Sequence, residues 1–304
     1  MHKIKLKNSK LKTKEDFCRY ALVTGAASGM GRIYAMRLAL MGYSLVIVDV
    51  NREMLLETES VVRDAVSSVF SPENPDKPCF NTVAIVMDLS EITAAQNIAD
   101  RVRNAGLDVE VLVNNAGLLP VDETVALSRK CISTTLMVHC YTSLMLCREF
   151  VPMMQEKGCG YVLNISSLAA WMPWPAIGLY ANTKRFVKDY SRSLRIECAG
   201  SGVSVTTAYF GAVDTPMIRL KPSLRKLAHA LGIMIYPEKA VDRALAAMFR
   251  RKKGVMPGLL NHVFKPVAAV MPDWLLIPVF RWARRFLPGY NRYGVRGHAI
   301  SQKK

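Results

Sequence analysis

The sequence predicts an α/β protein with a doubly wound parallel sheet, built as a single domain with a basic amphipathic C-terminal extension. Two observations lead to this fold class. Short apolar, β-branched runs alternate with stretches of helical spacing between residues 18 and 211, and polar clusters follow the ends of those runs. Strands that alternate with helices form a parallel sheet that is covered on both faces. The 304-residue chain, with 51% hydrophobic and 21% charged residues, has the composition of a globular protein.

The first expected unit is a strand, a turn, a helix and a second strand. "YALVTGA" at 20–26 is an apolar run that contains a glycine, "RIYAMRLALMGY" at 32–43 has helical spacing, and "SLVIVDV" at 44–50 is β-branched. A proline-rich loop is expected at 71–80. The other expected strands cover 82–90, 109–117, 160–167 and 203–211, and the expected helices cover 52–69, 91–105, one or two segments of 123–156, and 180–199.

Positive charge is concentrated at the two ends of the chain. Of the formal net charge of +17, six lysines lie in the first fourteen residues, and seven Lys or Arg residues without any acid lie in 281–304. Such ends favour attraction to a negative surface, either anionic lipid or nucleic acid, although solvated tails have the same composition. No stacking-aromatic motif accompanies the basic residues, so we expect no nucleic-acid partner.

The seven cysteines include no C-x-x-C pair and no cluster, which predicts reduced thiols and no metal site. The N-terminal lysines are not followed by an apolar segment typical of a secretory signal. No uncharged apolar run reaches the roughly 18 residues that a spanning helix needs. A cytoplasmic protein is therefore expected.

A glycine-rich stretch, "TGAASGMG" at 24–31, lies between the first strand and the first helix. Glycines let the backbone approach a pyrophosphate, and the helix that opens at this point offers free N–H groups and the positive end of its dipole. The residues that would line this turn are Gly25, Ser28, Gly29, Met30 and Gly31. A glycine-rich turn without a ligand is the alternative for this stretch taken alone.

Asp49 ends the second strand, and its position favours a dinucleotide-binding turn over a glycine-rich turn without a ligand. A carboxylate there can accept hydrogen bonds from an adenosine ribose, and it would repel a 2′-phosphate, so it favours NAD over NADP. Arg52 lies three residues further on and can screen that acid. NADP therefore remains possible.

The order T-G-x-x-x-G-x-G, then "NNAG" at 114–117, then Ser167, then Tyr180-x-x-x-Lys184 resembles the short-chain dehydrogenase/reductase family, and within it the hydroxysteroid dehydrogenases and ketoreductases. The resemblance covers about residues 18–260 and implies a Rossmann-like, dinucleotide-binding oxidoreductase domain. That leaves 1–17 as a basic N-terminal arm and 261–304 as the extension. The family mostly forms dimers or tetramers, so a homodimer or homotetramer is expected.

The resemblance implies that Tyr180 is the general acid/base, that Lys184 activates it and that Ser167 anchors the substrate oxygen. Tyr180 and Lys184 are four residues apart, so they share one face of a helix. A phenol with a pKa of about 10 is a poor acid–base group at neutral pH, and a nearby ammonium and a positively charged nicotinamide are expected to lower that pKa. Ser166 is the rival of Ser167.

The resemblance also assigns residues to the cofactor. Tyr180 and Lys184 would contact it as well as the substrate. Asp88 and Leu89 would lie on the adenine side, and Val213 and Thr215 would meet the nicotinamide amide. The ribose region would be lined by Asn115, Ala116 and Gly117. Strand caps and turns are the plain alternatives for these positions.

Two departures from the family pattern stand out. The family usually places an asparagine where this chain has His139, and a histidine can also bridge the lysine and a water chain. We therefore expect His139 to take part in the proton relay. The family's "PG" is "FG" here, at Phe210 and Gly211. The bulk of Phe210 is expected to alter the pocket near the nicotinamide.

Two segments rich in apolar residues are expected on the substrate side. "WMPWPAIGL" at 171–179 precedes the tyrosine, and a substrate lid is expected at about 214–236, where apolar residues mix with basic ones. An apolar pocket favours a lipophilic secondary alcohol or ketone, such as a steroid, a retinoid-like compound or a 3-oxoacyl chain, although the same side chains could simply pack the core. A non-catalytic dinucleotide-binding sensor or scaffold is the alternative function.

The extension carries an amphipathic pattern. Leu275, Val279, Trp282 and Phe286 recur at helical spacing, and arginines gather on another face, at Arg281, Arg284 and Arg285. Pro278 is expected to break or start that helix. The pattern fits peripheral contact with an anionic membrane. It fits equally well a tail that packs over the substrate mouth or on a partner subunit.

Overall fold

Seven parallel strands form the central sheet of the computed structural model, which describes residues 19–69, 80–215, 222–230, 234–258 and 271–283. Their order across the sheet is β3-β2-β1-β4-β5-β6-β9. The strands are β1 (Arg19–Thr24), β2 (Ser44–Asp49), β3 (Thr82–Val86), β4 (Asp108–Asn114), β5 (Gly160–Ser167), β6 (Val203–Phe210) and β9 (Gly254–Val255). The order reverses between β1 and β4, and ligands in such sheets bind beyond the carboxyl ends of the strands at that point.

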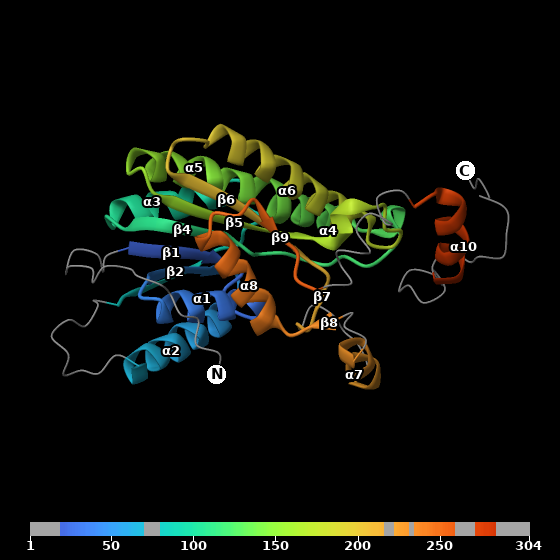
Figure 1. The fold of residues 1–304 in the computed structure, drawn as a ribbon, viewed down its shortest axis with the longest axis horizontal. Coiled ribbons are helices and arrows are strands. Elements are labelled where there is room, and N and C mark those ends of the chain that lie inside the picture. The colour runs from blue at the N-terminus through green and yellow to red at the C-terminus, as the bar shows by residue number, and fades with distance from the viewer. Residues whose placement is uncertain (1–18, 70–79, 216–221, 231–233, 259–270, 284–304) are drawn as a thin grey trace, which may run out of the picture.

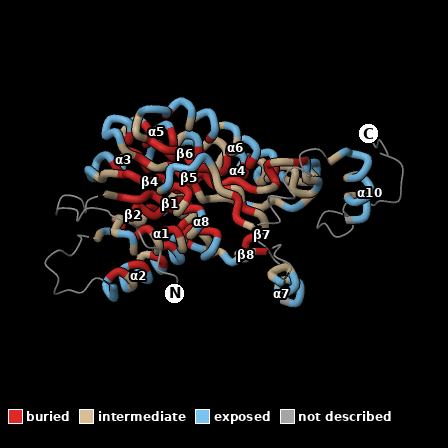
Figure 2. The backbone as a smooth tube through the Cα atoms, in the orientation of Figure 1, coloured by how far each residue is buried: buried red, intermediate tan, exposed pale blue. Residues whose placement is uncertain are grey.

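Helices cover both faces of the sheet, as the sequence predicts (Figure 1). One face carries α1 (Gly29–Leu40), α2 (Arg52–Val69) and α8 (Pro237–Phe249), and the other carries α3 (Ala94–Asn104), α5 (Ser143–Glu156) and α6 (Gly178–Glu197). Successive strand residues point to opposite faces. Ala21 and Val23 therefore belong to the core under α1, whereas Leu22 belongs to the core under α3 and α5. Figure 2 shows the resulting buried band along the strands.

Most expected elements are present, and two of them, the helix 52–69 and the strand 160–167, match their expected bounds. The segment 123–156 holds a short turn η2 (Thr124–Ala126), α4 (Arg129–Leu136), a π-helical segment η3 (Met137–Thr142) and α5. Helix α8 and strand β9 were not predicted. β9 has only two residues, which is too short to show a period, and it pairs with β6 at Thr207 and Ala208.

Smaller elements follow β6. A two-stranded parallel sheet joins β7 (Ala212–Val213) to β8 (Met234–Ile235), and α7 (Pro222–Ala230) lies between them in the chain. Another helix, α10 (Asp273–Ala283), belongs to the C-terminal extension. The N-terminal arm 1–17, nearly all of the loop 71–80, and Arg284, Arg285 and Phe286 lie outside the described residues.

The expectation for Pro278 is wrong, because this residue lies inside α10. A proline removes one backbone donor and so frees the carbonyl of the residue four positions earlier, which is Trp274. Trp274 is 73% exposed, so water can satisfy that carbonyl and the helix can continue. Among the helices of the described residues, none combines the length and the apolar character that crossing a bilayer requires.

Candidate active site

The glycine-rich turn between β1 and α1 makes a backbone cradle. Gly25 and Gly29 have positive φ angles of 66° and 54°, which L side chains rarely adopt. A Cβ atom on Gly31 would lie 1.9 Å from the carbonyl oxygen of Gly25, and a Cβ on Gly25 would lie 2.9 Å from the Cα of Ala116. Because Ser28 is the N-cap of α1, the free N–H groups of that helix open onto this turn. The cradle therefore fits a dinucleotide pyrophosphate.

The loop after β4 is bonded directly to this cradle. The backbone N–H groups of Asn115 and Ala116 donate to Thr24 Oγ1 at 3.0 and 3.1 Å, and Asn115 Nδ2 donates to the Thr24 carbonyl at 3.0 Å. The Thr24 hydroxyl donates in turn to the Val113 carbonyl. Asn115, Ala116 and Gly117 are thus held beside the glycine-rich turn, where the sequence places them.

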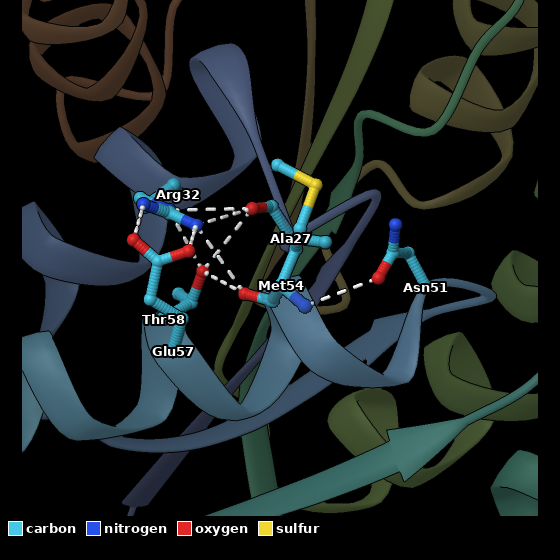
Figure 3. A network of polar contacts seen from close by, with 6 residues as sticks. All are labelled: Ala27, Arg32, Asn51, Met54, Glu57 and Thr58. Carbon is cyan, nitrogen blue, oxygen red and sulfur yellow. Dashed lines mark hydrogen bonds and ion pairs between the residues drawn. The ribbon is translucent and has the colours of Figure 1, made fainter.

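Asp49 and Arg32 hold the same turn from two sides. Asp49 Oδ2 accepts a hydrogen bond from the Ala27 N–H at 3.1 Å, and its Oδ1 accepts one from Asn51 N–H at 3.0 Å. Arg32 donates to the Ala27 carbonyl at 2.9 Å and makes a two-armed ion pair with Glu57, both at 2.9 Å (Figure 3). The Asp49 carboxylate therefore lies at the end of β2 beside the cradle, where an adenosine ribose would be recognised.

Ser166 and Ser167 at the end of β5 point to different partners. The Ser166 hydroxyl is buried and donates to the Lys184 carbonyl at 2.7 Å, so it fastens β5 to α6. Ser167 Oγ accepts from the Ala169 N–H at 3.1 Å and contacts the Phe210 carbonyl at 3.3 Å. Its hydroxyl also acts on the Tyr180 phenol, whose pKa it lowers. This arrangement agrees with the choice of Ser167 over Ser166.

Tyr180 and Lys184 share the inner face of α6, as their spacing predicts. Lys184 Nζ lies 5.7 Å from the centre of the Tyr180 ring and donates to the Ile165 carbonyl at 2.9 Å. Burial lowers the pKa of Lys184 to about 8. Burial also raises the pKa of Tyr180, and the Ser167 hydroxyl acts in the opposite direction. Burial is thus the larger cause in the chain by itself, and the lowering of the Tyr180 pKa by Lys184 together with a positively charged nicotinamide stays a prediction.

His139 lies in η3, is 1% exposed, and bridges two parts of the site. Its Nε2 accepts a hydrogen bond from the Leu118 N–H at 2.7 Å, so the ring hydrogen is on Nδ1, which contacts Thr183 Oγ1 at 2.8 Å. Burial, and secondly the charge of Lys184, hold the pKa of His139 well below its usual value. A Cβ on Gly117 would lie 3.1 Å from His139 Nε2 and 3.6 Å from Lys184 Nζ.

The remaining predicted residues lie at strand ends with mixed surroundings. Asp88 is exposed and accepts from the Ser90 N–H and hydroxyl, whereas Leu89 is buried and its carbonyl accepts from Thr142. Val213 is buried in β7, and Thr215 Oγ1 lies 3.5 Å from the Val213 carbonyl. The Phe210 side chain packs in the core under α1 and α8.

Sequence reasoning missed several supporting residues. Thr24 is the first letter of the glycine-rich motif, so its place before Gly25 could have marked it. Asn164 bonds Asn114 at 2.8 Å and Ser191 at 2.9 Å within the buried interior, and Thr183 contacts His139. These contacts join residues far apart in the chain, and spacing alone cannot reveal them.

Comparison with known proteins agrees with this geometry. The pattern of the short chain dehydrogenase family matches residues 19–223. Retinol dehydrogenase 10-A of Xenopus laevis is 25% identical over 276 residues, covering 86% of this chain and 81% of that protein. The human very-long-chain 3-oxoacyl-CoA reductase is 30% identical over 275 residues, covering 86% and 78%. The 17-beta-hydroxysteroid dehydrogenase type 3 of Danio rerio is 31% identical over 207 residues, covering 66% and 62%.

Solved structures share the fold at lower identity. A short-chain dehydrogenase from Sphingobium yanoikuyae in complex with NADPH superimposes with a TM-score of 0.67 at 22% identity, over 93% of this chain and 99% of that one. A 7beta-hydroxysteroid dehydrogenase superimposes with a TM-score of 0.72 at 21% identity, over 85% and 94%.

Proposed function

This chain belongs to the short-chain dehydrogenase family and is an NAD(P)-dependent oxidoreductase that acts on a CH–OH group, and from that premise we propose that its substrate is a lipophilic secondary alcohol or ketone. The observation that carries this proposal is the convergence of Ser167, Tyr180 and Lys184 beside the glycine cradle. A bound nicotinamide cofactor supplies the hydride acceptor or donor. All other tasks fall to the chain.

The Oη atom of Tyr180 carries the proton that the substrate oxygen gains or loses. Ser167 orients that oxygen, because its hydroxyl reaches the Tyr180 side chain. Lys184 supplies positive charge on the same helix face, and a positive charge favours the phenolate. Since burial raises the pKa of Tyr180, we propose that Lys184 acts most strongly when further positive charge is bound beside the phenol.

The substrate class rests on the relatives and on the residues before α6. The relatives are named for retinol, steroid and 3-oxoacyl-CoA chemistry. The segment 171–179 contributes Trp171, whose ring lies 5.7 Å from that of Tyr209, and the buried Met172. Aromatic and sulfur-containing side chains near the end of β5 favour an apolar ligand over a sugar.

NAD is the proposed preferred cofactor, with NADP as the alternative. The Asp49 carboxylate favours a free ribose diol over a 2′-phosphate. Arg32, which donates to the Ala27 carbonyl in the turn, is already paired with both carboxylate oxygens of Glu57 (Figure 3). Comparison of dissociation constants for NADH and NADPH tests this preference. A tighter constant for NADPH contradicts it.

The rival function is a non-catalytic dinucleotide-binding sensor or scaffold. It requires the glycine cradle but not Ser167, Tyr180 and Lys184. Absorbance at 340 nm, followed with steroid ketones, retinoids and 3-oxoacyl thioesters in the presence of NADH or NADPH, separates the two. Turnover supports the enzyme, whereas cofactor binding without turnover over the whole panel supports the sensor.

We further propose a cytoplasmic location with peripheral contact at anionic membranes through α10. Trp274, Ile277 and Val279 are 73%, 47% and 58% exposed on this short helix. Arg281 lies in its last turn, and six further Lys or Arg residues follow the helix in sequence within 284–304. Apolar side chains beside positive charge are typical of helices that lie in a membrane interface.

A homodimer or homotetramer is proposed as well. Leu144 on α5 and Phe186 on α6 are 39% and 40% exposed, and the family mostly assembles through its long helices. Light scattering coupled to size-exclusion chromatography tests this proposal. A monomer mass at micromolar concentration contradicts it.

A further inference from the structure

Asp214 lies between the two residues that are proposed to meet the nicotinamide, Val213 and Thr215. Its backbone N–H donates to the Ile235 carbonyl at 3.0 Å, which extends the β7–β8 pairing by one residue. The side chain is 18% exposed. The backbone therefore fixes the carboxylate in place at the end of β7.

Each oxygen of the Asp214 carboxylate contacts a basic side chain from α7. Arg225 Nη1 lies 3.3 Å from Asp214 Oδ1, and His229 Nε2 lies 2.9 Å from Asp214 Oδ2. The ring of His229 also stacks on Tyr236 at a centroid distance of 4.2 Å and an interplanar angle of 16°. Arg225 and His229 are four residues apart and so project from one face of α7.

A helix on the surface of a globular protein usually turns its apolar residues toward the body and its charged residues toward solvent. Here Leu224 and Leu227 are 51% and 53% exposed, while the side chain of His229 is only 15% exposed. The face of α7 that meets the body thus carries His229 and part of Arg225, whose side chain is 41% exposed, and its leucines face outward. Apolar burial contributes little to holding such a helix, so the polar contacts to Asp214 are its principal attachment among the described residues.

We propose that Asp214 is a positioning residue that clasps α7, the helix of the expected substrate lid, to the strand segment that carries Val213 and Thr215. The proposal rests on the proposed function for the place of the nicotinamide. A shift of Val213 and Thr215 on cofactor binding moves the intervening carboxylate, and the clasp passes that movement to α7. The clasp thereby couples cofactor binding to the position of the substrate-side helix.

The test is hydrogen exchange of α7 amides, measured by mass spectrometry on the full chain with and without NADH. Asp214→Asn removes the charge while keeping the size of the side chain. Loss of an ion pair and of a charged hydrogen bond is expected to speed exchange of α7 about tenfold. Asp214→Glu is expected to restore slow exchange. Asp242→Asn is the matched control, since it breaks a 2.8 Å ion pair with Arg37 between α1 and α8, and it is expected to leave α7 unchanged.

NADH gives the second readout. In the unmodified chain NADH is expected to slow exchange both at 24–31 and in α7, whereas in Asp214→Asn it slows exchange at 24–31 alone. If the α7 amides exchange at the same rate in Asp214→Asn and in the unmodified chain, Asp214 does not hold α7. Protection of α7 by NADH that persists in Asp214→Asn overturns the coupling. Absence of protection at 24–31 in every chain counts against cofactor binding, and so against the proposed function, while the comparison without NADH still decides the clasp.

Discussion

Neighbouring residues in this site carry different tasks, and Ser166 and Ser167 illustrate how. The pleat of β5 sends their side chains to opposite faces, so one hydroxyl reaches the Lys184 carbonyl and the other reaches Tyr180. The motif spacing predicted the serine that meets the tyrosine. It could not predict that the rival serine holds the lysine's backbone, because that contact depends on the packing of α6 on the sheet.

Separate losses are expected from the two serines. Ser167→Ala should reduce kcat by about 100-fold or more, as loss of a group that orients a reacting atom does, and should cost about 1 kcal/mol of unfolding free energy, because the Ala169 N–H loses its cap. Ser166→Ala should cost about 1 kcal/mol of unfolding free energy, because the buried hydrogen bond to the Lys184 carbonyl is lost, and should leave kcat nearly unchanged. Urea unfolding and steady-state rates measure both. Equal loss of activity in the two variants would refute this division of tasks.

His139 links protonation to stability. Its folded pKa lies below the unfolded value, so below about pH 6.5 the unfolded chain binds a proton that the folded chain does not, and stability falls as the pH falls. Between pH 7.5 and pH 5.5 this group should lower the free energy of unfolding by about 1 kcal/mol. In His139→Asn that loss should disappear, which urea unfolding at both pH values detects.

The same variant tests the proton relay. If His139 takes part in it, His139→Asn should lower kcat and shift the pH–rate profile. Unchanged rate and profile would leave His139 as a bridge between Leu118 and Thr183 only.

At the scale of elements, the pattern of the chain predicts the alternating strands and helices well but misses irregular pieces. Strands β1, β2 and β5 are apolar runs with glycine or polar ends, which periodicity recognises. β9 has two residues and exists because β6 offers it an edge. The π-helical η3 likewise follows from tertiary contacts of His139 with Leu118 and Thr183 rather than from any local signal.

The glycine cradle allows a matched pair of substitutions. Gly31→Ala places a methyl group 1.9 Å from the Gly25 carbonyl oxygen, so it should displace the turn and abolish NADH binding. Gly42→Ala meets no atom within 4 Å but has a φ of 92°. It should cost about 1 kcal/mol of stability and leave NADH affinity unchanged. NADH fluorescence titration distinguishes them, and full affinity in Gly31→Ala would show that the cradle does not hold the cofactor.

At the scale of the whole molecule, positive charge is concentrated at the two ends of the sequence, and α10 exposes apolar groups. The sequence predicted the two basic ends and an amphipathic extension, and α10 carries its apolar residues at the surface. Which surface covers them could not be deduced from the pattern, because a membrane interface, a substrate mouth and a partner subunit select the same residue types. Membrane contact is therefore a proposal that charge and exposure support together.

Sedimentation with anionic liposomes tests that contact. The double variant Trp274→Glu and Ile277→Glu should reduce the bound fraction several-fold, since each substitution puts a charge where an apolar side chain would enter the membrane interface. Added salt should weaken binding of the unmodified chain. Val125→Glu, at a valine that is 84% exposed on η2, is the control and should bind normally. Equal binding of all three chains would exclude α10 as the contact.

The central claim is that Tyr180 exchanges the proton while the cofactor exchanges the hydride. Tyr180→Phe removes only the phenol oxygen, and NADH titration verifies that the cofactor site is intact. Turnover at 340 nm with a ketone from the panel should fall by at least about a thousandfold, a loss that reflects both acid–base catalysis and orientation. A Tyr180→Phe variant that turns over the same ketone at the unmodified rate would contradict the account.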